Sequence, residues 1–356
     1  IVIDGVSSDC GEHISMALNG TNLYISYYDS THDMVKLAHS NDSGTTWEVY
    51  LVDKTTCGGT SVAVSGATVH LAYYAENSYA SLFSIDIEAA APITGFNLGG
   101  STHDFTLTID GVPNNITLPD NANTQIDNIV TAINNAYNPD IVAYNYNGRR
   151  VAVFEQTISD GNGIGFTNGI ATSVDGILFT VPTTVANGDA SIQELRYAKS
   201  TSLHTWDIQS IESAGYGLAP SINADGSNLG VTYVTNDATG TIRYAYSSNN
   251  GANWTSYGDL FTPGSTSGDY FGALRFDGSG SALFAFYDED SQVLMFTKGD
   301  YNGTDLDAAQ IVIDNNTGRG TFPAMAVDGS DVFIIYFDSV DEDLMIIKSE
   351  DLGSSW

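Results

Sequence analysis

The stretch SNDSGTTW, from Ser40 to Trp47, decides the fold because it recurs twice in nearly the same form. The other copies are SSNNGANW, Ser247 to Trp254, and SEDLGSSW, Ser349 to Trp356. Each copy holds a serine, an acidic or amide residue two positions later, a glycine and a final tryptophan. This pattern predicts a tight hairpin, because Asp and Asn accept backbone N–H bonds, Gly adopts a positive φ and Trp packs beneath the turn.

All four tryptophans of the chain lie at this one repeat position, since KSTSLHTW, ending at Trp206, is a degraded copy without the glycine. The residues expected to build the turns are Asp42, Gly44, Trp47, Trp206, Asn249, Gly251, Trp254, Asp351, Gly353 and Trp356. The motif resembles the Asp-box, or bacterial neuraminidase (BNR) repeat, of sialidases and many other propellers. The resemblance implies a sialidase-like β-propeller in which the box folds a hairpin and performs no chemistry.

Five glycine turns of similar composition accompany the boxes. They lie around Gly20, Gly66, Gly226, Gly278 and Gly329, so their spacings are 46, 160, 52 and 51 residues. Each turn follows a short alternating strand and precedes an aromatic-rich strand, which is the pattern of a β-hairpin. A third strand, a turn and a fourth strand follow. Four antiparallel strands about every 50 residues predict an all-β, five-bladed β-propeller.

The two ends of the chain are related by the same repeat. IVID opens the chain at Ile1 to Asp4 and returns at Ile311 to Asp314, where it is expected to be a fourth strand. The fifth unit stops at Trp356, before a fourth strand of its own. The sequence therefore predicts that the N-terminal strand completes the last blade and closes the ring without an exposed edge.

One spacing, 160 residues, indicates an insertion between the second and third strands of the second blade. The expected domains are the propeller segments 1–78 and 192–356 and a small inserted α+β domain, 79–191. Within the insertion we expect a hairpin, a helix and a second hairpin. Ile126, Ile129, Val130 and Ile133 follow the helical period.

The inserted stretch from Phe105 to Phe179 resembles the hook IN motif of flagellins and hook-associated proteins. The resemblance implies a surface-exposed, non-catalytic domain of the kind found in appendages and adhesins. An unrelated α+β insertion with the same pattern is the alternative.

Charge and cysteine content restrict the partners and the compartment. The 43 acidic and 11 basic residues give a net charge of -32, which disfavours nucleic acid and anionic membranes. No apolar run approaches the roughly 18 residues of a membrane span. The polar, acidic composition favours an extracellular protein, secreted or displayed on the cell surface, although a saline habitat also fits it. Cys10 and Cys57 precede the first strands of adjacent blades, which predicts a disulfide, with two free thiols as the alternative.

Acidic and aromatic residues gather on the face opposite the glycine and box turns, because successive strands alternate in direction. The expected ligand-binding residues are Tyr28, Asp29, Tyr74, Glu76, Tyr287, Asp288, Arg319 and Asp338, with Glu12, His13 and Asp269 nearby. Such a surface suits carbohydrate binding, or calcium at Asp29, Asp288 and Asp338. The structural alternative is that these acids cap turns.

The number and the expected positions of the arginines do not favour catalysis. The resemblance to sialidases implies three arginines that hold a carboxylate, but the propeller has only Arg196, Arg243, Arg275 and Arg319. Only Arg319 is expected on the acidic face, so the triad is not found. A glycoside hydrolase using Glu12, Asp269 and Asp288 is the alternative, since such enzymes need two suitably spaced carboxylates.

The sequence therefore predicts an extracellular, non-catalytic recognition or assembly module. Its expected partner is a glycan or another surface ligand, or copies of itself in an appendage, fibre or adhesin. No nucleic acid and no membrane insertion are expected. Calcium is the one candidate cofactor.

Overall fold

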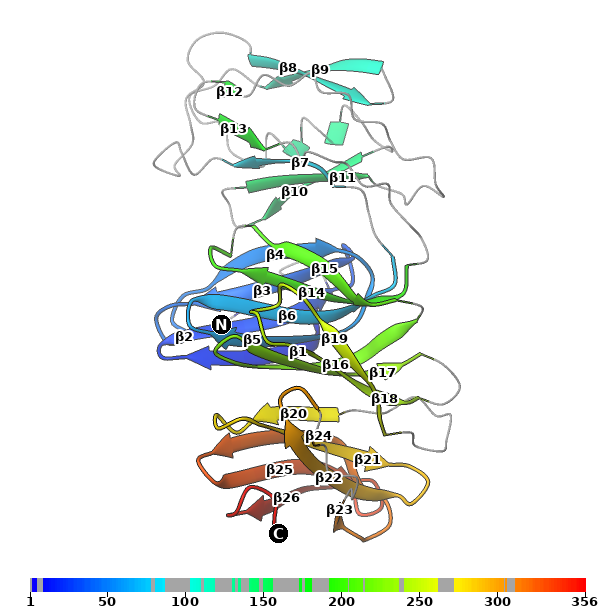
Figure 1. The fold of residues 1–356 in the computed structure, drawn as a ribbon. Helices are drawn as coiled ribbons and strands as arrows, with labels where there is room; N and C mark the ends of the chain where they lie inside the picture. Colours follow the sequence, from blue (N-terminus) through cyan, green and yellow to red (C-terminus); the bar gives the residue numbers. More distant parts are fainter. Residues whose placement is uncertain are drawn as a thin grey trace. The chain divides into compact units, whose positions relative to one another are not determined.

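The computed structural model describes most of the chain. The described residues are 2–4, 9–77, 81–86, 103–109, 112–118, 130–131, 134–135, 141–146, 150–155, 173–174, 177–180, 192–203, 205–213, 215–236, 240–261, 272–303, 305 and 311–356. The chain divides into two compact units (Figure 1). The first unit contains Ile1–Trp47, Thr56–Glu76 and Ile192–Trp356, and the second contains Glu48–Thr55 and Asn77–Ser191. Among the described residues, no helix has the length and apolar character that crossing a membrane requires.

Five antiparallel sheets follow one another along the propeller segments. The first has the order β1 (Cys10–Asn19), β2 (Asn22–Asp29), β3 (Met34–Ser40) and β4 (Glu48–Lys54). The second has the order β5 (Cys57–Ser65), β6 (Thr68–Ala75), β14 (Glu194–Ser200) and β15 (Asp207–Glu212). The third has β16 (Tyr216–Asp225), β17 (Asn228–Thr235), β18 (Ile242–Ser247) and β19 (Thr255–Phe261).

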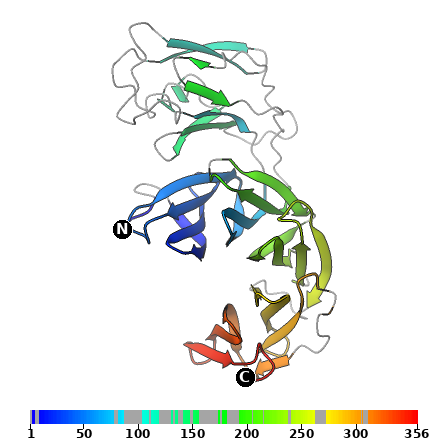
Figure 2. The ribbon, with the colours of Figure 1, turned by 60° about the vertical axis from the view of Figure 1, so that its left-hand side comes forward.

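The last two sheets complete the series. The fourth contains β20 (Gly272–Phe276), β21 (Ser281–Asp288), β22 (Val293–Asp300) and β23 (Ile311–Asp314), and the fifth contains β24 (Arg319–Asp328), β25 (Asp331–Asp338) and β26 (Asp343–Ser349). The first strands β1, β5, β16, β20 and β24 are neighbours in that order. Figure 2 shows the sheets succeeding one another from blue to red. These sheets confirm the all-β, five-bladed propeller.

The core lies between successive blades. Leu195 and Tyr197 of the second blade pack with Ile222 and Tyr233 of the third in one buried cluster. Two similar clusters join the third blade to the fourth and the fourth to the fifth. Each fully buried aromatic or aliphatic side chain contributes about 1.5–3 kcal/mol relative to its exposed state. The alternating strands of the sequence therefore form blades because both faces of each internal sheet are covered.

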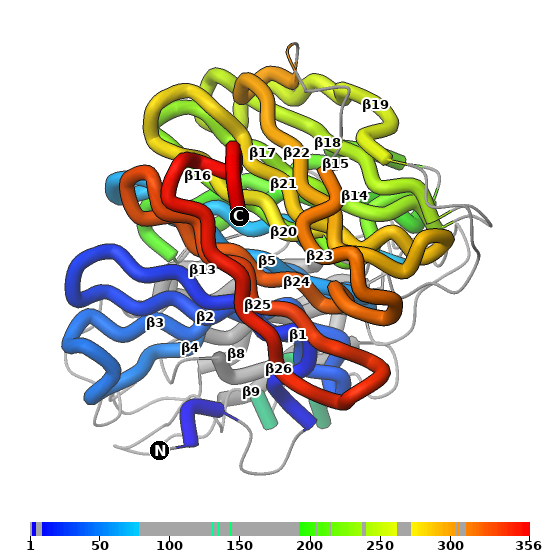
Figure 3. Tube along the Cα trace, turned by 90° about the horizontal axis from the view of Figure 1, so that it is seen from below, coloured from blue at the N-terminus to red at the C-terminus, as the bar shows by residue number. Residues whose placement is uncertain are grey.

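The expected closing strand differs from the structure. The fifth sheet comprises only β24, β25 and β26, drawn in orange and red in Figure 3, and residues 2–4 are not part of any described strand. Instead, the Asp4 carboxylate accepts hydrogen bonds from the Tyr27 hydroxyl at 2.7 Å and the Lys36 ammonium at 3.0 Å. Asp314 accepts the equivalent bond from Tyr336 at 2.7 Å. The shared IVID sequence therefore reflects a shared contact of its aspartate with the following blade.

The second unit contains a five-stranded sheet and a separate hairpin. The sheet order is β10 (Ile141–Tyr146), β11 (Arg150–Glu155), β7 (Ser81–Asp86), β13 (Ile177–Thr180) and β12 (Ser173–Val174). The hairpin pairs β8 (His103–Ile109) with β9 (Val112–Leu118). Both hairpins expected in the insertion, β8–β9 and β10–β11, are confirmed. The helix expected over Ile126–Ile133 lies largely outside the described residues.

Candidate functional site

The three complete boxes form nearly identical networks of hydrogen bonds. The glycine N–H donates to the first serine Oγ at 2.8, 3.0 and 2.8 Å in the three copies. The residue before the tryptophan donates its N–H to the Asp or Asn side chain at 2.8, 2.9 and 2.7 Å. Donation from the Thr46 N–H and hydroxyl lowers the pKa of Asp42 to about 2. The predicted structural role of the boxes is therefore confirmed.

The boxes also join neighbouring blades. The rings of Trp254 and of Tyr197 on the preceding blade form a T-shaped contact with their centroids 5.0 Å apart. Trp356 and Phe296 form the same contact, also with 5.0 Å between the ring centroids. A Cβ added at Gly353 would lie 2.2 Å from the Phe296 ring, and the glycine φ is +82°. The glycine is therefore needed both for the turn conformation and for the close approach of the two blades.

Asp29 was expected at a ligand-binding mouth, but its carboxylate is fully buried and engaged. It accepts the Lys36 ammonium at 2.7 Å and the His32 ring Nδ1 at 2.9 Å. Burial alone would raise the pKa of Asp29, but the hydrogen bonds from Lys36 and His32 outweigh it, so the pKa is lowered. The side chain therefore acts as an ion-paired structural anchor.

Asp338 and Arg319 form a second structural pair. The Asp338 side chain is 1% exposed and accepts the Arg319 Nε at 2.5 Å and the backbone N–H of Val340 at 2.9 Å. Burial alone would raise the pKa of Asp338, but the hydrogen bonds from Val340, Asp341 and Arg319 together lower it. Arg319 also lies 3.6 Å from Asp341. Arg319 and Asp338, both predicted to bind a ligand, thus form an ion pair with each other.

The expected calcium site is not assembled. Asp288 accepts the backbone N–H of Asp290 at 3.1 Å and so caps a turn at the end of β21. Asp29, Asp288 and Asp338 end the second strands of three different blades. Across the described part of the chain, no group of three His, Cys, Asp or Glu side chains could hold a metal ion. The turn-capping interpretation fits these aspartates better than the calcium interpretation.

The three tyrosines expected to bind a ligand, Tyr28, Tyr74 and Tyr287, are buried, with side chains only 5%, 0% and 9% exposed. The Tyr28 hydroxyl donates to Asp33 at 2.8 Å. The Tyr74 hydroxyl accepts from the Asn236 amide at 3.3 Å. Each of these tyrosines is the penultimate residue of a second strand, and its side chain is buried in the propeller.

Three polar residues of the predicted mouth are exposed. Glu12 accepts a hydrogen bond from the Ser30 hydroxyl at 3.1 Å, and Glu76 directly follows the last residue of β6. His13 has a φ of +53°, and its carbonyl accepts the Thr60 hydroxyl at 2.7 Å. Asp269 lies outside the described residues.

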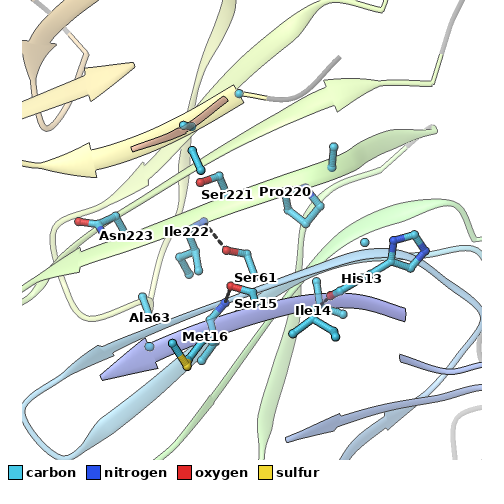
Figure 4. Close-up of a pocket in the computed structure, with 18 of the residues that line it drawn as sticks. His13, Ile14, Ser15, Met16, Ser61, Ala63, Pro220, Ser221, Ile222 and Asn223 are labelled. Carbon is cyan, nitrogen blue, oxygen red and sulfur yellow. Dashed lines mark hydrogen bonds between the residues drawn. The ribbon is translucent and has the colours of Figure 1, made fainter. Parts of the chain in front are cut away.

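The first strands of all five blades line one cavity of about 590 Å³, part of which Figure 4 shows. On its wall, Ser15, Ser61 and Ser221 accept the backbone N–H of Val62, Ile222 and Leu274 on the next blade, at 3.2, 3.1 and 3.3 Å. Sequence reasoning missed these serines. The available signal was their position, five residues before the glycine turn in three of the five repeats.

The predicted disulfide is not formed, because Cys10 and Cys57 are both thiols. The Cys10 thiol points toward the Asp4 carboxylate at 3.8 Å, whereas the buried Cys57 thiol donates to the carbonyl of Gly59 at 3.2 Å. Equivalent positions on adjacent blades therefore do not bring the sulfur atoms together.

Comparison with known proteins shows distant similarity of fold alone. No family model and no curated protein matches the chain. A K499G mutant of the NanB sialidase from Streptococcus pneumoniae is 10% identical, with a TM-score of 0.48 over 97% of this chain and 62% of that chain. The intramolecular trans-sialidase from Ruminococcus gnavus is 14% identical, with a TM-score of 0.44 over 93% and 77% of the two chains.

An α-L-arabinofuranosidase from Lactobacillus brevis is 6% identical, with a TM-score of 0.41 over 95% of this chain and 90% of that chain. The present chain thus resembles sialidases distantly over most of its length, but spans only 62% of the NanB chain. None of these comparisons supports the likeness of the insertion to the hook IN motif.

Proposed function

We propose that the protein is an extracellular, non-catalytic recognition module, secreted or displayed on the cell surface, that binds a glycan at the cavity mouth. The observation that supports the non-catalytic part of this proposal is the engagement of Asp29 and Asp338, two of the carboxylates that the sequence placed at the mouth. Asp29 and Asp338 are buried in ion pairs, with lowered pKa values. A general acid needs a carboxyl that reaches the substrate and titrates near the working pH, and these two residues meet neither condition.

The cavity wall is consistent with a ligand rich in hydroxyl groups. Serine and threonine hydroxyls at Ser15, Thr60 and Ser61 alternate with aliphatic side chains such as Ile14 and Met16. Polar groups of this kind fix the orientation of a sugar, while the aliphatic groups cover its apolar face. The exposed His13 and Glu12 at the edge of β1 would provide further hydrogen bonds.

An assembly role belongs to the same proposal. The resemblance of 105–179 to the hook IN motif supports a place in an appendage, fibre or adhesin, in which copies of the chain would be the partners. This support comes from sequence alone. Concentration-dependent filaments, seen by electron microscopy, would favour assembly over glycan binding.

A glycoside hydrolase is the second candidate function. It is favoured by Glu12, which is exposed beside the cavity-lining residue His13, and it would use Asp269 and Asp288 as further carboxylates. Retaining and inverting hydrolysis each require a carboxyl pair about 5–10 Å apart across the scissile bond.

One experiment separates these functions. The full chain is applied to a broad glycan array, with and without calcium, and the supernatant is analysed by mass spectrometry for released sugars. We expect retention without release, weakened by His13→Asn, which preserves the left-handed backbone preference. Glu350→Gln, on the last box turn, is the matched control and should bind normally. Sugar release that Glu12→Gln or Asp288→Asn abolishes would instead establish the hydrolase.

A further inference from the structure

Arg275 is the unusual residue of the cavity wall. It lies on β20, three residues before the glycine turn, and lines the cavity. The equivalent residues of the other blades are Ala17, Ala63, Asn223 and Ala326. Arg275 is therefore the one charged residue at this repeat position, where three of the other four blades carry alanine.

The cavity is also free of acidic residues. Although the chain has 43 Asp and Glu residues, none of the described residues that line the cavity is an Asp or a Glu. The lining is made of glycine, alanine, serine, threonine, proline and aliphatic residues, with His13, Asn223 and Arg275 as its remaining polar members. A wall of this composition does not repel an anion, in contrast to the rest of this acidic protein.

Arg275 differs from the other propeller arginines in its partners. Arg196 pairs with Glu194 at 2.7 Å, Arg243 with Asp259 at 3.0 Å and Arg319 with Asp338 at 2.5 Å. Within the described ranges, Arg275 forms no ion pair, and its Nη1 donates to the adjacent Leu274 carbonyl at 2.7 Å. Burial lowers the pKa of Arg275, yet a guanidinium remains protonated at neutral pH.

A half-buried charge without a counter-ion is costly, because the hydration that it loses is not repaid by an ion pair. The remaining N–H groups of Arg275 are donors in a planar fork that matches the oxygens of a carboxylate, sulfate or phosphate. The nearby blade offers a further donor. The Asn223 Oδ1 accepts the N–H of Phe276 at 3.0 Å, which fixes the amide beside the strand of Arg275. Among the described residues the Asn223 Nδ2 forms no hydrogen bond, so it can donate to a ligand.

Figure 4 shows Asn223 and Ser221 on the same strand of the cavity wall. Ser221 accepts the N–H of Leu274, so β16 holds the backbone on both sides of Arg275. The position of the Arg275 backbone is thereby set by two hydrogen bonds from one neighbouring strand. The Asn223 amide and the backbone that carries Arg275 are thus held in place before any ligand arrives, which lowers the cost of binding.

We propose that the central cavity binds a small oxyanion or carboxylate, held by the Arg275 guanidinium with the Asn223 amide as second donor. The net charge of -32 does not prevent this binding. Exposed charges are largely screened beyond about 10 Å at 0.1 M salt, whereas the acid-free wall determines the field inside the cavity. Arg275 and Asn223 line the same cavity as the wall residues proposed for the glycan but are not among them, so variants at these two positions test the anion site separately.

The test is isothermal titration calorimetry of the full chain with sodium sulfate, sodium phosphate and sodium acetate in turn. Ionic strength is held constant with sodium chloride. We expect saturable binding of at least one of these anions at a single site. Arg275→Met should weaken that binding at least about tenfold, the loss typical of a charge-assisted hydrogen bond. The affinity of Arg275→Lys should lie between the affinities of the unmodified chain and of Arg275→Met.

Arg196→Met is the matched control, because it removes a propeller guanidinium that Glu194 already engages, and its affinity should equal that of the unmodified chain. Asn223→Ala should reduce the affinity less than Arg275→Met does. If none of the three anions shows saturable binding, or if Arg275→Met binds as tightly as the unmodified chain, the proposal is overturned. Should Arg275→Met fail to fold, unchanged affinity in Asn223→Ala would count against the site in the same way.

Discussion

Glycines of equivalent boxes differ in what surrounds them, and this difference gives a test at the residue scale. A Cβ at Gly353 would lie 2.2 Å from the Phe296 ring, whereas the nearest atom to a Cβ at Gly44 is the Leu23 side chain at 3.3 Å. Both glycines have a positive φ, +82° and +87°. Gly353→Ala should therefore cost about 3 kcal/mol of unfolding free energy and Gly44→Ala about 1 kcal/mol. Equal losses in denaturant unfolding would contradict the interblade role of Gly353.

His70 provides a test of pH dependence. Its side chain is fully buried, its Nδ1 bonds to the Tyr197 hydroxyl at 2.7 Å, and among the described residues its Nε2 has no hydrogen-bond partner. Burial, followed by the nearby Lys199 charge, lowers the pKa of His70 from 6.5 to about 4. Between pH 6.5 and 4 the unfolded chain therefore binds a proton that the folded chain does not, so stability falls as the pH falls.

Protonation of His70 should lower the free energy of unfolding by about 3 kcal/mol in total once the pH is below 4. His70→Gln, which does not titrate, should flatten the curve of unfolding free energy against pH between 4 and 6.5. The box aspartates titrate lower, since the pKa of Asp42 and of Asp351 is about 2, and so do not obscure this window. An unchanged slope in the variant would show that other groups cause the acid sensitivity.

Residues with local partners could be predicted from the sequence, whereas residues with distant partners could not. The hydrogen bonds of Asp42 reach only residues two to four positions away, so its role follows from the motif. Asp338 depends on Arg319, nineteen positions earlier, on another strand of the same blade. Asp29 and Asp338 were therefore predicted as ligand-binding residues, because the Lys36 and Arg319 cations that pair with them come from other strands.

At the scale of the element, equivalent third strands differ in how far they are covered. Phe296 on β22 is fully buried, whereas Ile346 at the same repeat position on β26 is 65% exposed. Phe296→Ala should cost about 3–5 kcal/mol, because it leaves a cavity between two blades. Ile346→Ala should cost less than about 1 kcal/mol. Similar losses in the two variants would mean that another surface covers β26 in solution.

The serine contacts between first strands give a second test at this scale. Ser61 on β5 accepts the N–H of Ile222 on β16, and its removal would leave a buried donor without a partner. Ser61→Ala should therefore cost about 1–3 kcal/mol. Ser65→Ala, which removes a more accessible bond to the Gly226 carbonyl, is the control and should change stability by less than about 0.5 kcal/mol. The reverse order of effects in urea unfolding would contradict the contact.

The order and hairpin pairing of the strands could be predicted because alternation of period two and glycine turns are local signals. The closing strand could not. IVID at residues 311–314 pairs with β22 and also places Asp314 against Tyr336, whereas the described residues 2–4 of the first copy make only the second of these contacts. A repeated sequence therefore indicates a repeated environment, but not which of its contacts is kept.

At the scale of the whole molecule, the excess of acidic residues should make stability dependent on salt. With 43 acidic against 11 basic residues, like charges repel one another in the folded state more strongly than in the expanded unfolded chain. Raising sodium chloride from 10 to about 300 mM shortens the Debye length from about 30 to 6 Å and screens this repulsion. The midpoint of thermal unfolding should therefore rise steadily with salt. The rise should be the same in Arg275→Met, because general screening requires no anion site, and a flat or falling midpoint would show that surface repulsion is not a significant cost.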